Sequence, residues 1–279
     1  MTALIEHYFE HFSAETMDRY ACEYLAARSV DAKCVQSVAD ANLDLSSFSI
    51  LISRGPLSDE MREKVACFGG RNLSRIESLE YTRRAGLRQM SWAAAETPGE
   101  VHALFDKWKT DRLLLKRSDT FKGQGLSMLS REDLTDLTWD PQRDVFCAEV
   151  NPGDGTVAKV ECLGGCLIFQ WMWKQPPIRE LVTAGGLDTK AYLSGERIVD
   201  IRLPEDTVAK AVYCSELASR DGLGHTSLDL MRSPNGDWRV IELNTQEVAI
   251  WWTSKFESVR RNHAAAIHSL VRGNPALGG

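Results

Sequence analysis

The sequence predicts a mixed α/β protein that opens with a small open α/β module over about residues 1–90. Three observations predict it. Strand and helix patterns alternate over residues 1–90, and a loop containing Ser and Gly at 118–125 lies between two apolar strand segments. Residues 226–244 read as two short strands around Asn235-Gly236, the strongest short-range signal for a β-hairpin. A chain of 279 residues has room for two or three such modules.

The first 90 residues begin with an apolar strand pattern and continue with a capped amphipathic helix that opens at Ser13 and closes near Arg28. A turn is expected at Arg54-Gly55-Pro56. A later helix is expected to end at Gly86, because glycine readily adopts the left-handed conformation that terminates helices. The predicted elements are strands over 2–9, 33–38 and 48–53 and helices over 13–28, 58–68 and 72–85.

The rest of the chain alternates in the same way, apart from an irregular segment over 174–195 of the kind found at active sites. A second hairpin is expected about Gly164-Gly165. The other predicted elements are helices over 97–109, 130–137, 205–220 and 253–271 and strands over 112–117, 126–129, 144–150, 156–163 and 166–173.

Composition limits the classes of function. The net charge of −6 argues against a nucleic-acid partner or an anionic membrane surface, because both bind basic surfaces. No stretch approaches 18 uninterrupted apolar residues, and the N-terminus lacks a basic region before an apolar run, so neither a membrane span nor a signal peptide is expected. Seven cysteines, an odd number without paired spacing, suit a reducing cytoplasm. Cys162 and Cys166 are expected as small buried hydrophobic residues rather than half of a zinc site, since no second Cys/His pair has ligand spacing.

The hairpin at 226–244 brings acidic residues together. With Asn235-Gly236 at the centre of a two-residue type I′ turn, Asp229 lies opposite Glu242, and Asn244 shares their face because side chains alternate along a strand. Two carboxylates directly opposed on a strand pair destabilise it. A divalent cation reverses that sign, and Asp, Glu and Asn supply the hard oxygens that Mg²⁺ prefers. The alternative is a solvated acidic pair on an exposed face, which needs no metal.

The same turn sets the rest of the predicted register. Leu230 is expected opposite Ile241, and Met231 opposite Val240. The face away from the carboxylates is predicted to be apolar and to consist of Leu228, Leu230, Ile241 and Leu243.

The loop at 118–125 is a candidate phosphate site. Ser and Gly let backbone N–H groups converge on phosphate oxygens, although the loop matches neither a P-loop nor a dinucleotide-binding fingerprint. An ordinary hairpin turn is the alternative. Lys116 favours the phosphate interpretation, because a lysine at the end of an apolar strand is costly without an anionic partner. Its alternative is a lysine that extends from an edge strand to solvent.

These pieces, in this order, resemble the ATP-grasp ligases, in particular glutathione synthetases, D-alanine–D-alanine ligases and ribosomal-protein glutamate ligases. The resemblance covers roughly residues 70–250, and its most specific part is the Glu-x-Asn end of the hairpin, Glu242 to Asn244. It implies an ATP-grasp fold, in which two α+β subdomains clasp ATP behind an N-terminal α/β domain. The expected division is 1–92 for that first domain, 93–144 for the small lid subdomain and 145–279 for the C-terminal subdomain with the magnesium site.

The resemblance also implies roles for individual residues around ATP. Arg75 stands where a phosphate-contacting lysine is usual, and Lys116 would contact phosphate and the adenine edge. The loop at 118–125 would be the mobile flap over the phosphates. Asp154 would accept hydrogen bonds from the ribose hydroxyls. The implied flap and hinge residues are Ser118, Gly123, Gly125, Ala148, Glu149, Val150 and Asn151.

Further roles concern the reaction centre. Lys159 would grip the γ-phosphate or an acyl phosphate, and Asp229, Glu242 and Asn244 would hold Mg²⁺. Arg179 is the candidate for a substrate carboxylate, since its planar fork matches carboxylate oxygens; a surface arginine is the alternative.

The chain departs from the family after Asn244, where Thr245 to Val248 replaces the frequent Pro-Gly turn, so the acceptor substrate cannot be read across. Four tryptophans either line the acceptor pocket or pack in the core: Trp171, Trp173, Trp251 and Trp252. His225, near the hairpin, receives no role.

The function that the resemblance implies is ATP-dependent ligation of a small-molecule carboxylate to an amine, such as an amino acid or small peptide, through an acyl phosphate with release of ADP and phosphate. ATP and Mg²⁺ are the expected cofactors, and a homodimer is allowed because the family commonly dimerises. Three alternatives stay open: a ligase that modifies a peptide or protein, an ATP-grasp kinase that stops after phosphorylation, and a non-catalytic nucleotide-binding protein.

Overall fold

The computed structural model describes most of the chain. The described residues are 1–7, 12–38, 42–71, 73–118, 125–148, 155–176, 178–183, 186–188, 190, 194–199, 201–233, 235–245 and 254–273.

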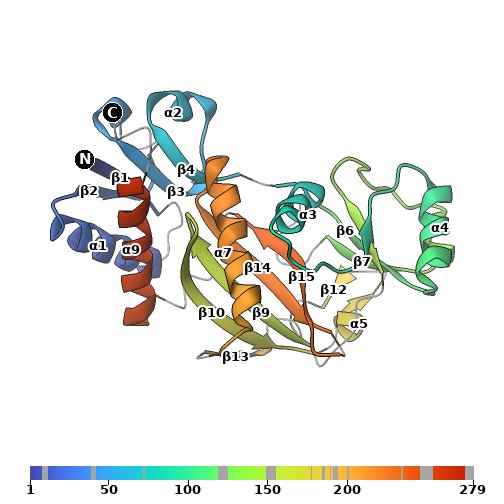
Figure 1. Cartoon of the computed structure of the whole chain (residues 1–279). Coiled ribbons are helices and arrows are strands. Elements are labelled where there is room, and N and C mark those ends of the chain that lie inside the picture. The colour runs from blue at the N-terminus through green and yellow to red at the C-terminus, as the bar shows by residue number, and fades with distance from the viewer. Residues whose placement is uncertain are drawn as a thin grey trace.

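The N-terminal part is an open parallel sheet with strand order β2-β1-β3-β4. It lies at one end of the molecule, with the N-terminus (Figure 1). The predicted open α/β architecture is therefore confirmed. Its strands are β1 (Thr2–Glu6), β2 (Asp31–Val35), β3 (Ile50–Pro56) and β4 (Ala66–Gly70), and its helices are α1 (Phe12–Ala26) and α2 (Asp59–Lys64).

Two predictions in this part are wrong. The helix expected over 58–68 ends at Lys64, and residues 66–70 form β4, because Ala66 and the two residues after it pair in parallel with β3. The turn expected at Arg54-Gly55-Pro56 lies within β3. In both places a long-range pairing outweighs the local sequence signal.

The second sheet is antiparallel, with order β5-β8-β6-β7. Helix α4 (Pro98–Trp108), capped by Thr97, packs Val101 and Phe105 against it. The helix expected over 130–137 is only a 3-10 turn, Glu132–Leu134. The strands are β5 (Trp92–Ala93), β6 (Leu113–Lys116), β7 (Leu126–Leu129) and β8 (Val145–Ala148).

The third sheet is central and has the order β13-β10-β9-β14-β15. Helix α7 (Glu205–Arg220) crosses one face of it (Figure 1) and forms a core with the apolar side chains of β9 and β14. The β9–β10 turn is the expected two-residue turn, since Gly164 and Gly165 both have positive φ, 57° and 79°. The strands are β9 (Thr156–Leu163), β10 (Cys166–Lys174), β13 (Glu196–Ile198), β14 (His225–Arg232) and β15 (Trp238–Asn244).

Two more helices connect these sheets. Helix α3 (Arg75–Arg84) begins with a capping box and packs on β15, where Ser78 exchanges hydrogen bonds with the backbone of Leu243. The last helix, α9 (Glu257–Gly273), returns to the N-terminal sheet and lies between α1 and β10 (Figure 1). Among its described residues, the segment expected to be irregular forms the short elements α5 (Ile178–Leu181), β11 (Val182–Thr183) and β12 (Gly186–Leu187).

The cysteines behave in two ways. Cys162 is buried and Cys166 is half-buried against the core, as expected. Cys22 of α1 and Cys34 of β2 form a disulfide, a pairing that their spacing in the sequence did not predict.

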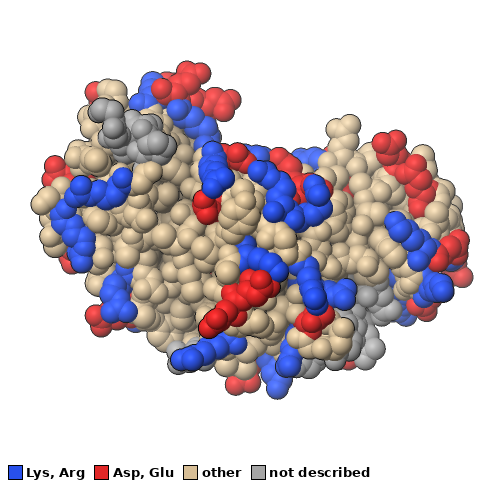
Figure 2. Space-filling model, in the orientation of Figure 1, with Lys and Arg blue, Asp and Glu red and all other residues tan. Residues whose placement is uncertain are grey.

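The surface has no single sign of charge on the face that Figure 2 shows, where basic and acidic side chains alternate over all three sheets. Among the described residues, no helix combines the length and apolarity needed to cross a bilayer.

Candidate active site

The hairpin of β14 and β15 places Asp229 opposite Glu242, and Ser227 opposite Asn244. The predicted pairing of Asp229 with Glu242 is therefore confirmed, but the turn type from which it was predicted is wrong. Ser233 N–H donates to the carbonyl of Asp237 at 2.7 Å, and Gly236 N–H donates to the carbonyl of Ser233 at 2.9 Å. The connection is therefore a three-residue loop, in which Gly236 has φ +87°.

A β-bulge at Ile241 compensates for the extra residue in this three-residue loop. Leu230 pairs with Val240 and Met231 with Arg239, one residue away from the predicted partners. The extra residue, Ile241, restores the register at Asp229. Val240 consequently takes the place expected for Ile241 in the core beneath α7, and Ile241 turns to a separate cluster with Met231.

A row of charged side chains crosses the central sheet at this level. Lys159 of β9 pairs with Asp229 of β14, which pairs with Glu242 of β15. The Lys159 ammonium donates to Asp229 Oδ2 at 2.6 Å, and the Arg75 guanidinium of α3 donates to Glu242 Oε1. Lys116 is 7% exposed, and its ammonium donates to the carbonyl of Ile241 at 2.8 Å. Three cations therefore surround two adjoining carboxylates.

The charges act differently on the two carboxylates. Burial raises the pKa of Asp229; the nearby Lys159 opposes this rise and the negative charge of Glu242 adds to it. Burial also acts to raise the pKa of Glu242, but Arg75, Lys116 and Lys159 together outweigh it and hold that pKa below its ordinary value. Glu242 is therefore the more firmly ionised of the pair.

The donor set fits a magnesium ion. Asp229 Oδ1 is buried without a hydrogen-bond partner among the described residues, so it is an oxygen that lacks a cation. No group of three His, Cys, Asp or Glu within the described ranges could hold a metal. The third protein ligand would be the amide oxygen of Asn244, on the same face of β15 as Glu242. Mg²⁺ usually takes one or two carboxylates and completes its shell with phosphates and water.

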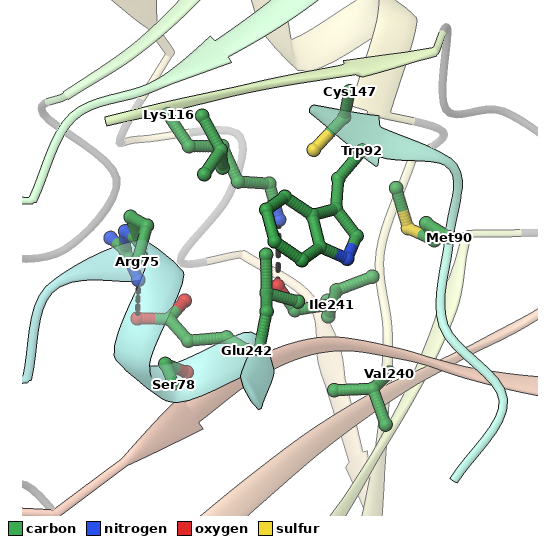
Figure 3. A pocket seen from close by; sticks show the side chains of 11 residues that line it. Arg75, Ser78, Met90, Trp92, Lys116, Cys147, Val240, Ile241 and Glu242 are labelled. Atoms are coloured by element: carbon green, nitrogen blue, oxygen red, sulfur yellow. Dashed lines mark hydrogen bonds and ion pairs between the residues drawn. The ribbon is translucent and has the colours of Figure 1, made fainter. Parts of the chain in front are cut away.

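A pocket adjoins this row between α3, β15 and the second sheet (Figure 3). Arg75, Lys116 and Glu242 lie on one side of it, and the Trp92 ring extends between Lys116 and Met90. The pocket thus combines a charged end with an apolar wall. The rest of the lining is Ser78, Leu79, Val145, Cys147, Val240 and Ile241.

Arg75 also contacts the start of the predicted flap. Its Nε donates to the carbonyl of Arg117 at 3.2 Å, and its backbone N–H donates to the Ser118 hydroxyl at 3.0 Å. The Ser118 N–H in turn donates to Asp144 at 2.8 Å. The N-terminus of α3 therefore holds the first residue of the flap.

The remaining candidates divide into two groups. Gly125 accepts a hydrogen bond from the Arg117 N–H at 2.9 Å, and Ala148 donates to the carbonyl of Ser91 at 3.0 Å, at the end of β8. Arg179 lies in α5, and only its backbone is described. The following lie outside the described residues: Gly123, Glu149, Val150, Asn151, Asp154, Trp251 and Trp252.

Trp171 and Trp173 are buried and stack on each other with ring centroids 6.5 Å apart. Trp171 pairs with Lys159, so both rings lie on the face of the central sheet that carries the charged row.

Sequence reasoning missed Glu161, two residues after Lys159 on the same face of β9. It pairs with Ser227, one row from the charged row, is 2% exposed, and accepts a hydrogen bond from Trp171 Nε1 at 3.3 Å. The signal was available, because Lys159 and Glu161 alternate with apolar residues along a strand.

Comparisons with solved structures show the ATP-grasp fold over nearly the whole chain. The macrocyclase MdnC, bound with precursor peptide MdnA from Microcystis aeruginosa MRC, is 14% identical with a TM-score of 0.63, over 96% of this chain and 99% of that one. A Chryseobacterium gregarium RiPP-associated ATP-grasp ligase, in complex with ADP and a leader and core peptide, is 14% identical with a TM-score of 0.64, over 98% and 96%. D-alanyl-alanine synthetase A from Vibrio cholerae O1 biovar eltor str. N16961 is 12% identical with a TM-score of 0.57, over 100% and 99%. No sequence model of a protein family matches, and no curated protein does.

Proposed function

We propose that this ATP-grasp chain is an ATP-dependent ligase that joins a carboxylate to an amine through an acyl phosphate. One observation carries the proposal: Arg75, Lys116 and Lys159 converge on the adjoining carboxylates Asp229 and Glu242 beside a pocket with an apolar wall. The three similar structures named above, a macrocyclase, a ligase and a synthetase, support the same class of reaction.

Each residue has a part in holding the nucleotide. Asp229, Glu242 and Asn244 would hold Mg²⁺, which neutralises charge on the β- and γ-phosphates when bound. Lys116 and Arg75 line the pocket and would contact phosphate oxygens, and Lys159, beyond Asp229 in the row, would grip the γ-phosphate or the acyl phosphate. Protein catalysis of phosphoryl transfer consists mainly of positioning and electrostatic stabilisation, and these side chains supply both.

The reaction has two steps. A carboxylate oxygen of the substrate attacks the γ-phosphorus, the bond to the β,γ-bridging oxygen breaks, and ADP leaves. The amine nitrogen then attacks the acyl carbon, the C–O bond to phosphate breaks, and the amine loses a proton. Glu161, one row from Lys159 and roughly 7 Å along the strand, would bind the incoming ammonium and take its first proton, which frees the nitrogen lone pair for the attack. The second proton leaves with the departing phosphate. Arg179 is the candidate for holding the carboxylate that is activated.

The substrate class is an amino acid or a peptide. A peptide acceptor is supported by two of the similar structures, which contain precursor peptides.

The test uses the purified chain with ATP, Mg²⁺ and a panel of amino acids and short peptides. Phosphate release and mass spectrometry of the products are measured, with hydroxylamine added to trap an acyl phosphate as a hydroxamate. A ligase gives ADP, phosphate and an amide, and gives a hydroxamate when hydroxylamine replaces the amine. A stable phosphorylated product without amide would identify a kinase instead, and nucleotide binding without turnover on any substrate pair would indicate a non-catalytic protein.

A further inference from the structure

Each carboxylate expected to hold the metal already has a cationic partner within the chain. Asp229 accepts from Lys159 and Glu242 accepts from Arg75. Both pairs are largely shielded: the side chains of Lys159 and Asp229 are 15% and 8% exposed, and those of Arg75 and Glu242 are 14% and 27% exposed. Opposite charges attract more strongly in such places than in open solvent.

The local charges nearly balance without a metal. Two carboxylates face the three cations Arg75, Lys116 and Lys159, which leaves one net positive charge. A bare divalent cation would add two more positive charges. Even if it contacted only Asp229 Oδ1, which has no hydrogen-bond partner among the described residues, it would lie beside two cations that repel it.

Arg75 and Lys159 each make a second contact, which can persist when the ion pair with the carboxylate breaks. Arg75 Nε donates to the carbonyl of Arg117 at 3.2 Å, and the Lys159 ammonium lies 5.8 Å from the centroid of the Trp171 ring. Nucleotide phosphates would offer them new anionic partners, because Arg75 lines the pocket and Lys159 lies in the same charged row, two strands from the lining residue Glu242.

We propose that Arg75 and Lys159 are exchangeable counter-ions, which make this site reject a bare divalent cation and accept the metal only together with nucleotide phosphates. The inference rests on the proposed nucleotide site and assigns these two residues a role in selecting the metal–nucleotide complex. Binding of metal and nucleotide is then mutually reinforcing, and each raises the affinity of the other by the same factor.

The test measures free Mn²⁺ by electron paramagnetic resonance, with and without the non-hydrolysable analogue AMP-PNP. In the native chain, AMP-PNP raises Mn²⁺ affinity by at least about tenfold. In Arg75→Gln and Lys159→Met, Mn²⁺ alone binds several-fold more tightly than in the native chain, because a carboxylate has lost its competitor. AMP-PNP binds more weakly in both variants, so the two affinities move in opposite directions.

Two controls accompany these variants. Arg75→Lys keeps the positive charge beside Glu242 and should bind Mn²⁺ alone no more tightly than the native chain. Arg83→Gln removes another arginine of α3, one that pairs with Glu80 on the exposed side of the helix, and should change neither affinity.

Two results would overturn the inference. The first is native protein that binds Mn²⁺ equally well with and without AMP-PNP, which needs no variant. The second is folded Arg75→Gln and Lys159→Met variants that bind Mn²⁺ alone no more tightly than native protein. Either result in an enzyme that forms amides leaves the proposed ligase intact, whereas coupled binding without amide or hydroxamate overturns only the ligase.

Discussion

The guanidinium of Arg75 donates a hydrogen bond to the carboxylate of Glu242, a residue 167 positions later in the sequence. This contact joins the first turn of α3 to the end of β15. Arg75 also donates hydrogen bonds from its Nε to the carbonyl of Arg117 and from its backbone N–H to the hydroxyl of Ser118. One residue therefore connects β15, which carries the predicted metal ligand Glu242, to the start of the predicted flap.

Glu242→Ala should abolish ATP turnover while the fold survives. The substitution removes the carboxylate that three cations hold ionised, and with it a ligand for the metal. Phosphate release should fall to background, and circular dichroism should still show one cooperative unfolding transition. Full activity in this variant would contradict the metal assignment.

Lys116→Met should weaken nucleotide binding by about tenfold or more, because a charge-assisted contact to phosphate is lost from a mostly buried position. Methionine keeps most of the side-chain volume, so the native fold should persist. Calorimetry with AMP-PNP measures the loss. Lys210→Met is the matched control, since Lys210 pairs with Asp206 on the exposed face of α7. Equal nucleotide affinity in the two variants would remove Lys116 from the site.

Glu161→Gln should raise KM for the amine by about tenfold or more and leave hydroxamate formation unchanged. Glutamine can still accept the Trp171 hydrogen bond but carries no charge for an ammonium, whereas hydroxylamine reacts as a neutral molecule. The steady-state rates with the two nucleophiles are compared. Glu216→Gln, at an exposed pair with Arg220, is the control. Parallel losses with both nucleophiles would point to a purely structural role for Glu161.

Arg54→Met should destabilise the protein by about 3–5 kcal/mol. Arg54 donates to both oxygens of Asp18, at 2.9 and 2.6 Å, and all of these groups are buried, so the substitution leaves an uncompensated carboxylate. Urea unfolding measures the change. Arg19→Met removes an exposed partner of Glu15 on α1 and should cost less than about 1 kcal/mol. Similar losses in both variants would show that burial does not control the Arg54 pair.

Stability should fall as the pH drops below about 6.5. His225 and His263 lie together, Nε2 to Nε2 at 3.0 Å, and burial, with the charge of Arg54, lowers the pKa of each well below its ordinary value. The folded state therefore binds fewer protons than the unfolded state, and stability is complete above the unfolded pKa and lost below it. The slope is at most about 1.4 kcal/mol per pH unit for each histidine.

Urea unfolding between about pH 7.5 and 5.5 follows this dependence. His102→Gln, in an exposed position on α4, should leave the slope unchanged. A flat stability profile over this interval in the native protein would contradict the contribution of the buried pair.

The two hairpins show how far local sequence signals reach. Gly164-Gly165 forms the turn that its residue types predict, whereas Asn235-Gly236 does not. The second strand of that hairpin also pairs elsewhere: Val240 N–H donates to the carbonyl of Arg88 at 2.8 Å, next to a bridge with Gln89. The bulge at Ile241 therefore lies beside contacts with Arg88 and Gln89, which are distant in the sequence. The local sequence pattern of the hairpin contains no information about them.

The sequence alone determined which chemical groups this protein can use and roughly where they stand along strands and loops. Periodicity placed Lys116 at the end of a strand and Asp229, Glu242 and Asn244 on one face of a hairpin, because side-chain direction follows from the backbone of a single element.

Only the tertiary structure decided which charges meet. The partners Arg75 and Glu242, Lys159 and Asp229, and Arg54 and Asp18 come from different elements. Their strength depends on how far packing removes water from them, and packing is a property of the whole fold.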